Sequence, residues 1–329
     1  MTSHPVPADA AAFLSEWLGE DWSVQPLAGD ASVRAYYRII APGRTYMLAY
    51  YPPEVRGQLR RFMDAYRAVS PHGRIPEVVR HSDSAVVQSD VGDRTLYDLL
   101  HEDTAEGLRL YRAAVDLLVA FQRTAVRDIN PPFTAGVFLA ELDMARQYFV
   151  EKLMEVPEST AVRLEPVFRK LADHLSEHPD VLCHRDFHGQ NIHIVNSKLF
   201  LIDYQDMRMG PDTYDMASLL RDRGVGRFIG RETELELVDY YASRSGAPEG
   251  VRHRYFETLL QRSIKILGTF AKQPIARGRM HYLEFIPPTL ESIRRCLEEL
   301  PEFAVMGDLL PMEFSLEAAR RRAEAVKET

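Results

Sequence analysis

Lysine is scarce in this chain. Only six of the 40 basic residues are lysine, and the first is Lys152, so the preceding 151 residues carry arginine alone. A Walker A loop needs a Gly-Lys-Ser/Thr sequence to bring an ammonium group to nucleotide phosphates, and no Gly-Lys pair occurs anywhere in the sequence. This absence excludes P-loop ATPases and GTPases. Any nucleotide-binding lobe in the N-terminal half must therefore hold phosphates without the usual strand lysine.

Cysteine is scarce as well, and long apolar runs are missing. The two cysteines, Cys183 and Cys296, match neither a CxxC site nor a disulfide framework, so we expect both to be reduced and buried in the packing. No apolar run approaches the ~20 residues that span a bilayer. Residues 1–13 lack the basic and apolar regions of a signal peptide. We therefore expect a cytoplasmic protein without membrane contact.

The net charge of −8 comes with arginines that are scattered along the chain. A nucleic-acid surface needs a basic stripe that displaces counterions, so this pattern argues against a nucleic-acid partner. A small-molecule partner is expected instead. The length of 329 residues suffices for one large domain or two modest ones.

Short apolar segments and turns alternate over the first 90 residues. Helical spacing predicts helices at residues 9–18 and 55–69. β-Branched and aromatic residues between turns predict strands at residues 22–27, 33–40, 45–51, 77–81 and 85–89. This part of the chain is expected to form a small twisted sheet with one long helix.

Helical patterns dominate the rest of the chain. They predict helices at residues 95–101, 105–124, 135–154, 161–177, 214–223, 232–243, 252–272, 288–300 and 316–326. Between residues 181 and 204 three short apolar runs predict an embedded hairpin. The expected fold class is α+β, with a small β-rich lobe at residues 1–90, a hinge at residues 88–93 and a large helical lobe at residues 91–329.

The densest polar segment is HRDFHGQN at residues 184–191, which Asp203 follows in the apolar frame LFLIDYQD. Phosphoryl transfer needs an oriented acceptor and neutralised phosphate charge, so two carboxylates and an amide should converge around Mg²⁺. In this arrangement Asp186 accepts the proton of the attacking hydroxyl. Asn191 and Asp203 supply the oxygen ligands of the metal. We therefore predict Asp186 as the catalytic base and Asn191 and Asp203 as metal ligands.

The pattern H-x-D-x-x-x-x-N followed by I-D resembles the catalytic loop and metal-binding aspartate of the aminoglycoside and choline phosphotransferase family. His188 makes the loop more similar to small-molecule kinases than to protein kinases, whose loop usually runs HRDLxxxN. The resemblance implies a two-lobed, protein-kinase-like fold that uses ATP and Mg²⁺. Residues 1–90 would bind the nucleotide, and residues 91–329 would carry the catalytic loop and the acceptor site.

Several further segments are similar to the bacterial N-acetylmuramate/N-acetylglucosamine anomeric kinases of cell-wall sugar recycling. They are GDASVRAYYRI, YPPE, SDVGDRTLYDLL, PPF, ELDMARQYFVEKL, IDYQDMRMGPDTYDMASLLRD and QRSIKILGTFAK, which together cover most of the chain. The resemblance implies phosphorylation of the C1 hydroxyl of an amino sugar. Those kinases also lack the N-lobe lysine, which agrees with the lysine gap noted above.

The group that replaces the lysine is left open by the sequence. The turn at residues 29–32 lies where a phosphate-covering loop belongs, so its amides and the Ser32 hydroxyl are candidates for phosphate contact. Arg34 and Arg38 are the nearest cations, and strand alternation puts both on one face. The alternative is that one or both pair with surface carboxylates.

By the same resemblance, the backbone of Gln88, Asp90 and Val91 should face the adenine. The Asp90 side chain is expected to cap the helix that begins near Thr95, with contact to a ribose as the alternative. His184 and His188 are expected to brace the catalytic loop. His193 is expected to face solvent, which argues against a histidine metal site in this segment.

The acceptor site is expected in the C-terminal lobe. The candidates for contacts with sugar hydroxyls, the acetamido group and a lactyl carboxylate are Glu141, Gln147, Tyr148, Lys152, Arg262 and Lys265. Asp206 is a candidate for substrate contact, a metal-shell water or a structural hydrogen bond. Asp215 resembles the family's buried aspartate that ties its helix to the catalytic loop.

Two alternative functions stay open at this point. A kinase of the same fold could act on an aminoglycoside, choline, homoserine or another sugar. The missing lysine could instead mark a pseudokinase that only binds a nucleotide or a partner, although Asp186, Asn191 and Asp203 are all present.

Overall fold

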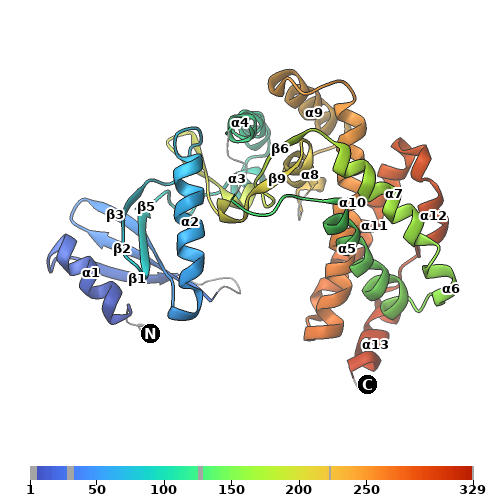
Figure 1. Cartoon of the computed structure of the whole chain (residues 1–329), viewed down its shortest axis with the longest axis horizontal. Coiled ribbons are helices and arrows are strands. Elements are labelled where there is room, and N and C mark those ends of the chain that lie inside the picture. Colours follow the sequence, from blue (N-terminus) through green and yellow to red (C-terminus); the bar gives the residue numbers. More distant parts are fainter. Residues whose placement is uncertain (1–5, 28–32, 125–128, 222–223, 328–329) are drawn as a thin grey trace. The chain divides into compact units, whose positions relative to one another are not determined.

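The computed structural model describes residues 6–27, 33–124, 129–221 and 224–327. The chain divides into two compact units, one made of Met1–Asn130 with Asp186–Met207 and the other of Pro131–Arg185 with Arg208–Thr329 (Figure 1). This division differs from a cut at residue 90. The helices between residue 90 and Asn130 belong to the first unit, because most of their contacts lie there. The same holds for Asp186–Met207, which begins within the catalytic loop.

The sheet of the first unit is antiparallel, with the strand order β1-β2-β3-β5-β4. Its strands are β1 (Ser23–Leu27), β2 (Ala35–Ala41), β3 (Arg44–Tyr50), β4 (Val78–His81) and β5 (Ala85–Ser89). Each lies within two residues of its predicted range. The prediction succeeded because β-branched and aromatic residues between turns pack well in a sheet.

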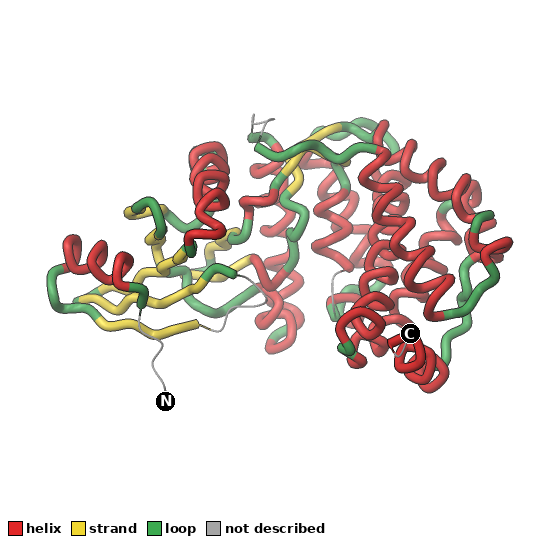
Figure 2. Tube along the Cα trace, turned by 60° about the horizontal axis from the view of Figure 1, so that its bottom comes forward, coloured by secondary structure: helices red, strands yellow, loops and turns green. Residues whose placement is uncertain are grey.

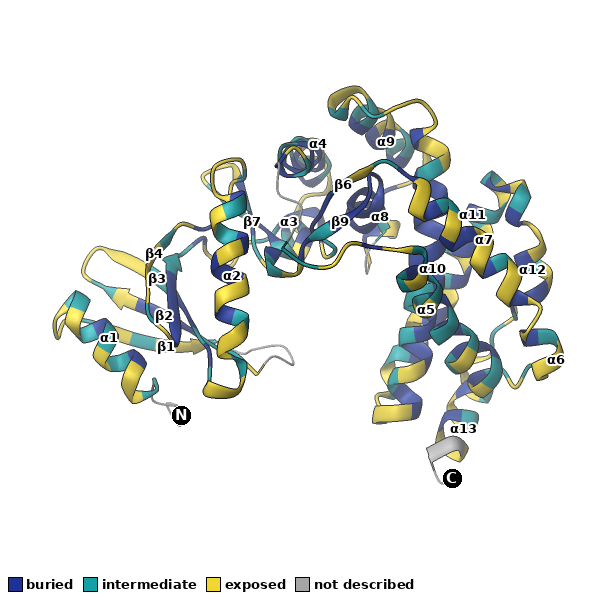
Figure 3. Ribbon diagram, viewed as in Figure 1, coloured by how far each residue is buried: buried dark blue, intermediate teal, exposed yellow. Residues whose placement is uncertain are grey.

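Two helices pack with this sheet. Leu14 of α1 (Ala8–Leu18) belongs to a buried cluster with Ile39, Leu48 and Val87 on one face. Neighbouring strand residues point to the opposite face, where α2 (Arg56–Val69) lies (Figure 1). Figure 3 shows the resulting contrast between buried strand residues and exposed outer helix faces.

The first unit also contains α3 (Leu96–Glu102), α4 (Thr104–Gln122) and a hairpin of β7 (Ile192–Val195) and β8 (Lys198–Leu201). The hairpin turn consists of Asn196 and Ser197, whose φ angles of 50° and 60° are the left-handed values that a two-residue turn requires. Immediately before β7, the turn Gly189–Asn191 packs against α3. A Cβ atom on Gly189 would lie 3.0 Å from the amide nitrogen of Tyr97, so glycine permits this close approach.

A two-stranded ladder and a helical array form the second unit. β6 (Asp180–Cys183) pairs with β9 (Arg208–Pro211), so the predicted three-run hairpin is wrong for its first strand. β9 escaped prediction because its sequence RMGP lacks strand-forming residues. The helices are α5 (Ala135–Ala145), α6 (Glu158–Ala161), α7 (Leu164–Glu177), α8 (Tyr214–Arg221), α9 (Arg231–Ser245), α10 (Val251–Arg277), α11 (Ile286–Glu299), α12 (Val305–Leu309) and α13 (Leu316–Lys327) (Figure 2).

α10 is the central helix of this unit. It contacts α5, α7, α8, α9, α11 and α13, and most of its length is buried. The predicted helix at residues 135–154 continues past α5 as a π-helical segment, Arg146–Leu153. Cys183 and Cys296 are both buried and reduced, which confirms their predicted place in the packing.

Gly268 brings α10 close to α5. A Cβ atom at this position would lie 2.7 Å from both the Cα and the amide nitrogen of Ala145. We expect Gly268→Ala to lower the free energy of unfolding by about 2 kcal/mol, because a backbone must shift to relieve the overlap. Urea unfolding measures this change. The matched control is Gly136→Ala at an exposed position of α5, where the free energy should stay the same or rise; equal stabilities for the two variants would contradict the packing argument.

Candidate active site

The backbone that leads into the catalytic loop is held by Asp215. Its carboxylate accepts hydrogen bonds from the amides of His184 at 2.6 Å and Arg185 at 2.9 Å. Arg185 has a φ of 81°, a conformation that is unusual for a residue other than glycine. Asp215 lies in α8 and is completely buried. The predicted tie between this helix and the loop is confirmed.

Arg262 supports the same stretch of backbone from α10. Its Nη2 donates to Ser218 Oγ at 2.9 Å and its Nη1 to the Arg185 carbonyl at 3.4 Å, and its guanidinium lies 4.6 Å from the centre of the Tyr214 ring. Only 8% of the residue is exposed, because this face of α10 points into the unit. These contacts make Arg262 a brace for the loop, and its contact with a sugar stays a prediction.

A hydrogen bond links Asp186 and Asn191 at the start of the segment Asp186–Met207. Asn191 Nδ2 donates to the Asp186 carbonyl at 2.9 Å and lies 3.4 Å from His188 Nε2. The Asp186 carboxylate itself belongs to an exposed residue. With the amide nitrogen turned to these partners, the Asn191 oxygen is the atom suited to a cation. The contact with His188 agrees with its predicted bracing role.

Asp203 lies directly beside this turn. Ile202 donates its amide to the Asn191 carbonyl at 3.0 Å, which places the metal-ligand candidates next to each other. Asp203 has a left-handed φ of 64°, and Gln205 Nε2 donates to its Oδ1 at 2.7 Å. Magnesium prefers oxygen ligands of the carboxylate and amide type. The donor set therefore fits the metal that the sequence predicts, and Gln205 is an orienting residue that sequence reasoning missed.

Arg34 is the N-terminal cation that reaches this region. Its guanidinium hydrogen-bonds with Tyr51, lies 5.7 Å from the centre of the Tyr36 ring, and interacts electrostatically with Asp203. Burial opposes its charge, yet these oxygen groups raise the pKa of Arg34 overall. For the neighbouring Tyr36, burial raises the pKa to about 12, so its hydroxyl stays neutral. Ser32 and the turn at residues 29–32, which are also predicted to contact phosphate, lie outside the described residues.

Arg38 has a different environment. It donates from Nε to Asp90 at 2.7 Å and from Nη2 to Asp93 at 2.7 Å. The sequence left open whether Arg38 contacts phosphate or pairs with carboxylates. The structure shows the pairing with carboxylates, and the guanidinium is hydrogen-bonded to both of them. We therefore replace the predicted phosphate contact with a role in holding the hinge.

Two further expectations about the hinge are corrected. Thr95 and Asp98 cap α3 through a reciprocal capping box, whereas Asp90 accepts from the Gly92 amide at 2.9 Å and pairs with Arg38. His193 does not simply face solvent, because its Nδ1 lies 2.7 Å from the Gly92 carbonyl. A β-bridge between Thr95 and His193 brings the two segments together.

The backbone that is predicted to face the adenine runs from Gln88 to Val91. Gln88 lies in β5, and Val91 is buried.

The second unit gathers some of the predicted acceptor residues. Lys265 Nζ lies 2.9 Å from Glu141 Oε1 and 3.3 Å from the Tyr214 hydroxyl. Gln261 Nε2 donates to the other Glu141 oxygen at 2.8 Å. Gln261 was not predicted, although its position one helical turn before Lys265 was a usable signal.

The other candidates do not join this group. Tyr148, in the π-helical segment, has the ammonium groups of Lys152 and Lys272 at 4.6 Å and 5.2 Å from its ring centre. Gln147 donates to Asp143 at 2.8 Å. Asp206 is exposed and belongs to the first unit, at the end of the turn Tyr204–Asp206.

Solved structures share this fold. The aminoglycoside phosphotransferase APH(2'')-IIa, in a complex with streptomycin and ATP, aligns with a TM-score of 0.64 and 17% identity over 87% of this chain and 97% of its own. The choline kinase LicA from Streptococcus pneumoniae aligns with a TM-score of 0.60 and 16% identity over 89% of this chain and 98% of its own. The small antiparallel sheet and the large helical part thus have the α+β architecture of small-molecule kinases.

The family follows from the sequence as well. The model of the phosphotransferase enzyme family matches residues 23–255, and the chain belongs to this family. A protein of Pseudomonas aeruginosa named N-acetylmuramate/N-acetylglucosamine kinase is 26% identical over 312 residues, which are 91% of each chain. A protein of the same name from Caulobacter vibrioides is 25% identical over 85% of this chain and 89% of its own. The predicted enzyme class, a phosphotransferase, is confirmed.

Among the residues that the structure describes, no helix combines the length and the apolar character needed to cross a bilayer.

Proposed function

We propose that this chain transfers the γ-phosphoryl group of ATP to the anomeric hydroxyl of N-acetylmuramate, N-acetylglucosamine or both. The observation that carries the proposal is the grouping of Asp186, Asn191 and Asp203 in one compact unit, in a chain whose relatives of this name match it over nearly its full length. Use of ATP and the recycling of cell-wall sugars imply that the enzyme works in the cytoplasm.

The proposed roles follow from the chemistry of each group. The exposed Asp186 carboxylate accepts the proton of the attacking hydroxyl. An anomeric hydroxyl is more acidic than an ordinary alcohol, so a carboxylate suffices as its base. Asn191 and Asp203 would hold Mg²⁺, which when bound neutralises negative charge on the phosphate oxygens. Positioning of the acceptor and this charge neutralisation supply most of the acceleration.

In this proposal Arg34 replaces the missing lysine. Its guanidinium lies in the electrostatic range of Asp203 and is fixed by Tyr51, so it is placed to contact nucleotide phosphates. We expect Arg34→Ala to raise the KM for ATP at least about tenfold, as the loss of a charge-assisted hydrogen bond does. Steady-state kinetics measure this. The control is Arg44→Ala, at an exposed position of the same sheet, which should change neither the KM for ATP nor kcat. If Arg34→Ala left both constants unchanged, another group would contact the phosphates.

For the acceptor we propose the Glu141, Gln261 and Lys265 group. These side chains combine carboxylate, amide and ammonium functions, which suit sugar hydroxyls, an acetamido group and a lactyl carboxylate. Tyr214 and Glu141 raise the pKa of Lys265 against the opposing effect of burial, so its ammonium group is charged and able to bind a carboxylate.

The acceptor panel is the test of the proposed function. The purified protein is incubated with ATP, Mg²⁺ and each of N-acetylmuramate, N-acetylglucosamine, choline, homoserine and an aminoglycoside, and products are followed by phosphorus NMR. Phosphorylation of an amino sugar with coupling of phosphorus to the C1 proton is the expected result. Phosphorylation of another acceptor would reassign the substrate, and no turnover with any acceptor would favour a pseudokinase.

A further inference from the structure

A cluster of histidine and glutamate side chains lies in the second unit, and the proposed phosphoryl transfer does not use it. Its centre is the buried carboxylate of Glu257 on α10. Three imidazole groups approach that carboxylate, from His174 on α7, from His178 just after it and from His253 on α10. Glu302, in the turn Pro301–Phe303, approaches His253 in turn. The cluster thus connects three separate segments.

The atoms that face one another in this cluster are of the metal-ligating kind. Glu257 Oε1 lies 2.7 Å from His174 Nδ1 and 3.6 Å from His253 Nε2, and His253 Nε2 lies 3.1 Å from Glu302 Oε1. One ligand atom each from His253, Glu257 and Glu302 falls within 4.8 Å of the other two. Neighbouring ligands of a tetrahedral zinc ion, with bonds of about 2.0–2.1 Å, are about 3.4 Å apart. The spacing therefore suits one shared ion.

His178 gives Glu257 a fixed orientation. Its Nε2 lies 2.7 Å from Glu257 Oε2, and only 5% of its side chain is exposed. With this oxygen occupied, Oε1 is the one that faces His174 and His253. Metal sites commonly hold a ligating carboxylate in place through such an outer partner. Oε1 is therefore the oxygen that can bind a metal ion, and Oε2 is the oxygen through which His178 orients the carboxylate.

Charge balance also favours a bound cation. A divalent ion would bring positive charge to the Glu257 and Glu302 carboxylates, which both lie near His253 Nε2. Imidazole nitrogen and carboxylate oxygen are ligands that zinc accepts.

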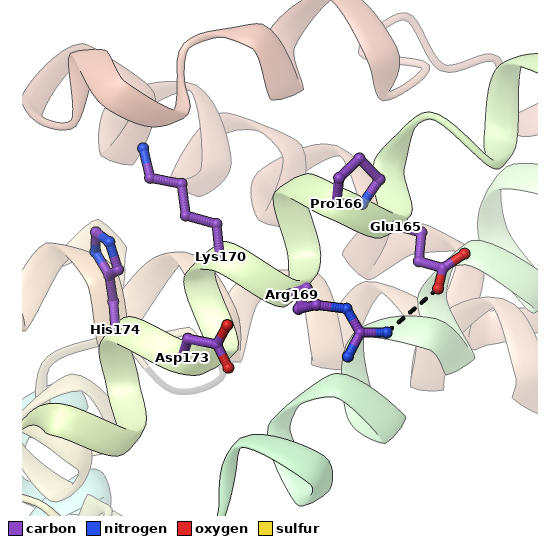
Figure 4. A pocket seen from close by; sticks show the side chains of 6 residues that line it. All are labelled: Glu165, Pro166, Arg169, Lys170, Asp173 and His174. Atoms are coloured by element: carbon purple, nitrogen blue, oxygen red, sulfur yellow. Dashed lines mark hydrogen bonds and ion pairs between the residues drawn. The ribbon is translucent and has the colours of Figure 1, made fainter.

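We propose that His253, Glu257 and Glu302 bind a zinc ion that joins α10 to the turn Pro301–Phe303, with His174 as a hydrogen-bond partner of Glu257. Three protein ligands leave the fourth position of a tetrahedral zinc ion to a water molecule. An ion reaches the cluster from solvent, since His253 is half exposed and His174 also lines a shallow surface pocket along α7. Figure 4 shows His174 at one end of that pocket, with Glu165 at the other.

The test uses the full chain without a histidine tag, after removal of metals with a chelator. Isothermal titration with zinc chloride should show one site per chain, and saturating zinc should raise the thermal midpoint by about 4 °C, as expected at roughly 100 times the Kd. Cobalt(II) should give the intense visible absorption of tetrahedral coordination. None of these readouts depends on kinase activity, so they stand apart from the test of the proposed function.

Two variants and two controls decide the assignment. His253→Gln and Glu302→Gln should each weaken zinc binding by more than about 100-fold. Both residues are at least partly exposed, so the variants should fold, which circular dichroism checks. His81→Gln and Glu298→Gln, at exposed positions elsewhere, should bind like the wild type. The proposal is overturned if the wild type binds no zinc at micromolar concentrations, or if His253→Gln and Glu302→Gln bind it as tightly as the wild type.

Discussion

Asp186→Ala is expected to lower kcat about 1,000-fold while leaving the Kd for ATP nearly unchanged. The carboxylate acts as the base for the attacking hydroxyl, and loss of a positioned base costs about 10²–10⁴-fold in rate. The contact that positions Asn191 uses the Asp186 backbone carbonyl, which the substitution keeps. Metal and nucleotide binding should therefore survive, as single-turnover kinetics and titration with a non-hydrolysable ATP analogue would show.

Controls separate this role from a general loss of structure or charge. Asp186→Asn keeps the shape of the side chain and should be about as inactive as the alanine variant, because an amide cannot accept the proton. Asp64→Ala removes an exposed carboxylate of the same unit that pairs with Arg67, and it should leave the turnover unchanged. Retention of more than about a tenth of the activity by Asp186→Ala would remove it as the base.

Asp215→Ala should lower the free energy of unfolding by about 3 kcal/mol and reduce turnover as well. The substitution leaves the buried amides of His184 and Arg185 without their acceptor, at about 1–3 kcal/mol for each unsatisfied group. The unusual backbone conformation of Arg185 loses its anchor one residue before Asp186. Urea unfolding and steady-state kinetics measure the two effects on the same preparation.

The matched variant is Asp215→Asn, which keeps one acceptor oxygen and should lose about half as much stability. Asp239→Ala removes a half-exposed carboxylate that pairs with Arg252 at the surface, and should change stability by less than about 1 kcal/mol. Wild-type stability in Asp215→Ala would show that the two amides find other partners, and would contradict the anchoring role.

Local patterns predicted the strands of the sheet and the position of the catalytic loop. β-Branched and aromatic residues between turns predicted the strands, and the spacing between Asp186, Asn191 and Asp203 is short enough that a turn and one hairpin bring them together. The same reasoning failed for β9, because a strand whose partners in β6 lie 25–31 residues away needs no strand-like sequence of its own. Pairing, and not propensity, made it a strand.

Side-chain partners far apart in the sequence were the main source of error. Strand alternation predicted Arg34 and Arg38 on one face, but β2 begins only at Ala35. Alternation also could not show that Asp90 and Asp93, 52 and 55 residues further on, lie beside Arg38. The same holds for the bond between His193 and the Gly92 carbonyl, which spans 101 residues. Such contacts depend on how elements meet, which periodicity does not encode.

The sequence by itself determined the reaction class, since the absence of a Gly-Lys pair and the HRDFHGQN segment depend only on residues close together in the chain. It also showed that the N-terminal part contains no lysine, but it left the group that contacts the phosphates open. Only the tertiary structure decided which arginine lies near Asp203, and that Arg262 braces the loop. The packing of α7, α10 and the turn Pro301–Phe303 likewise brought His174, Glu257 and Glu302 together, although they are far apart in the sequence. The physical reason is that burial and long-range contacts, unlike local motifs, are properties of the packed chain.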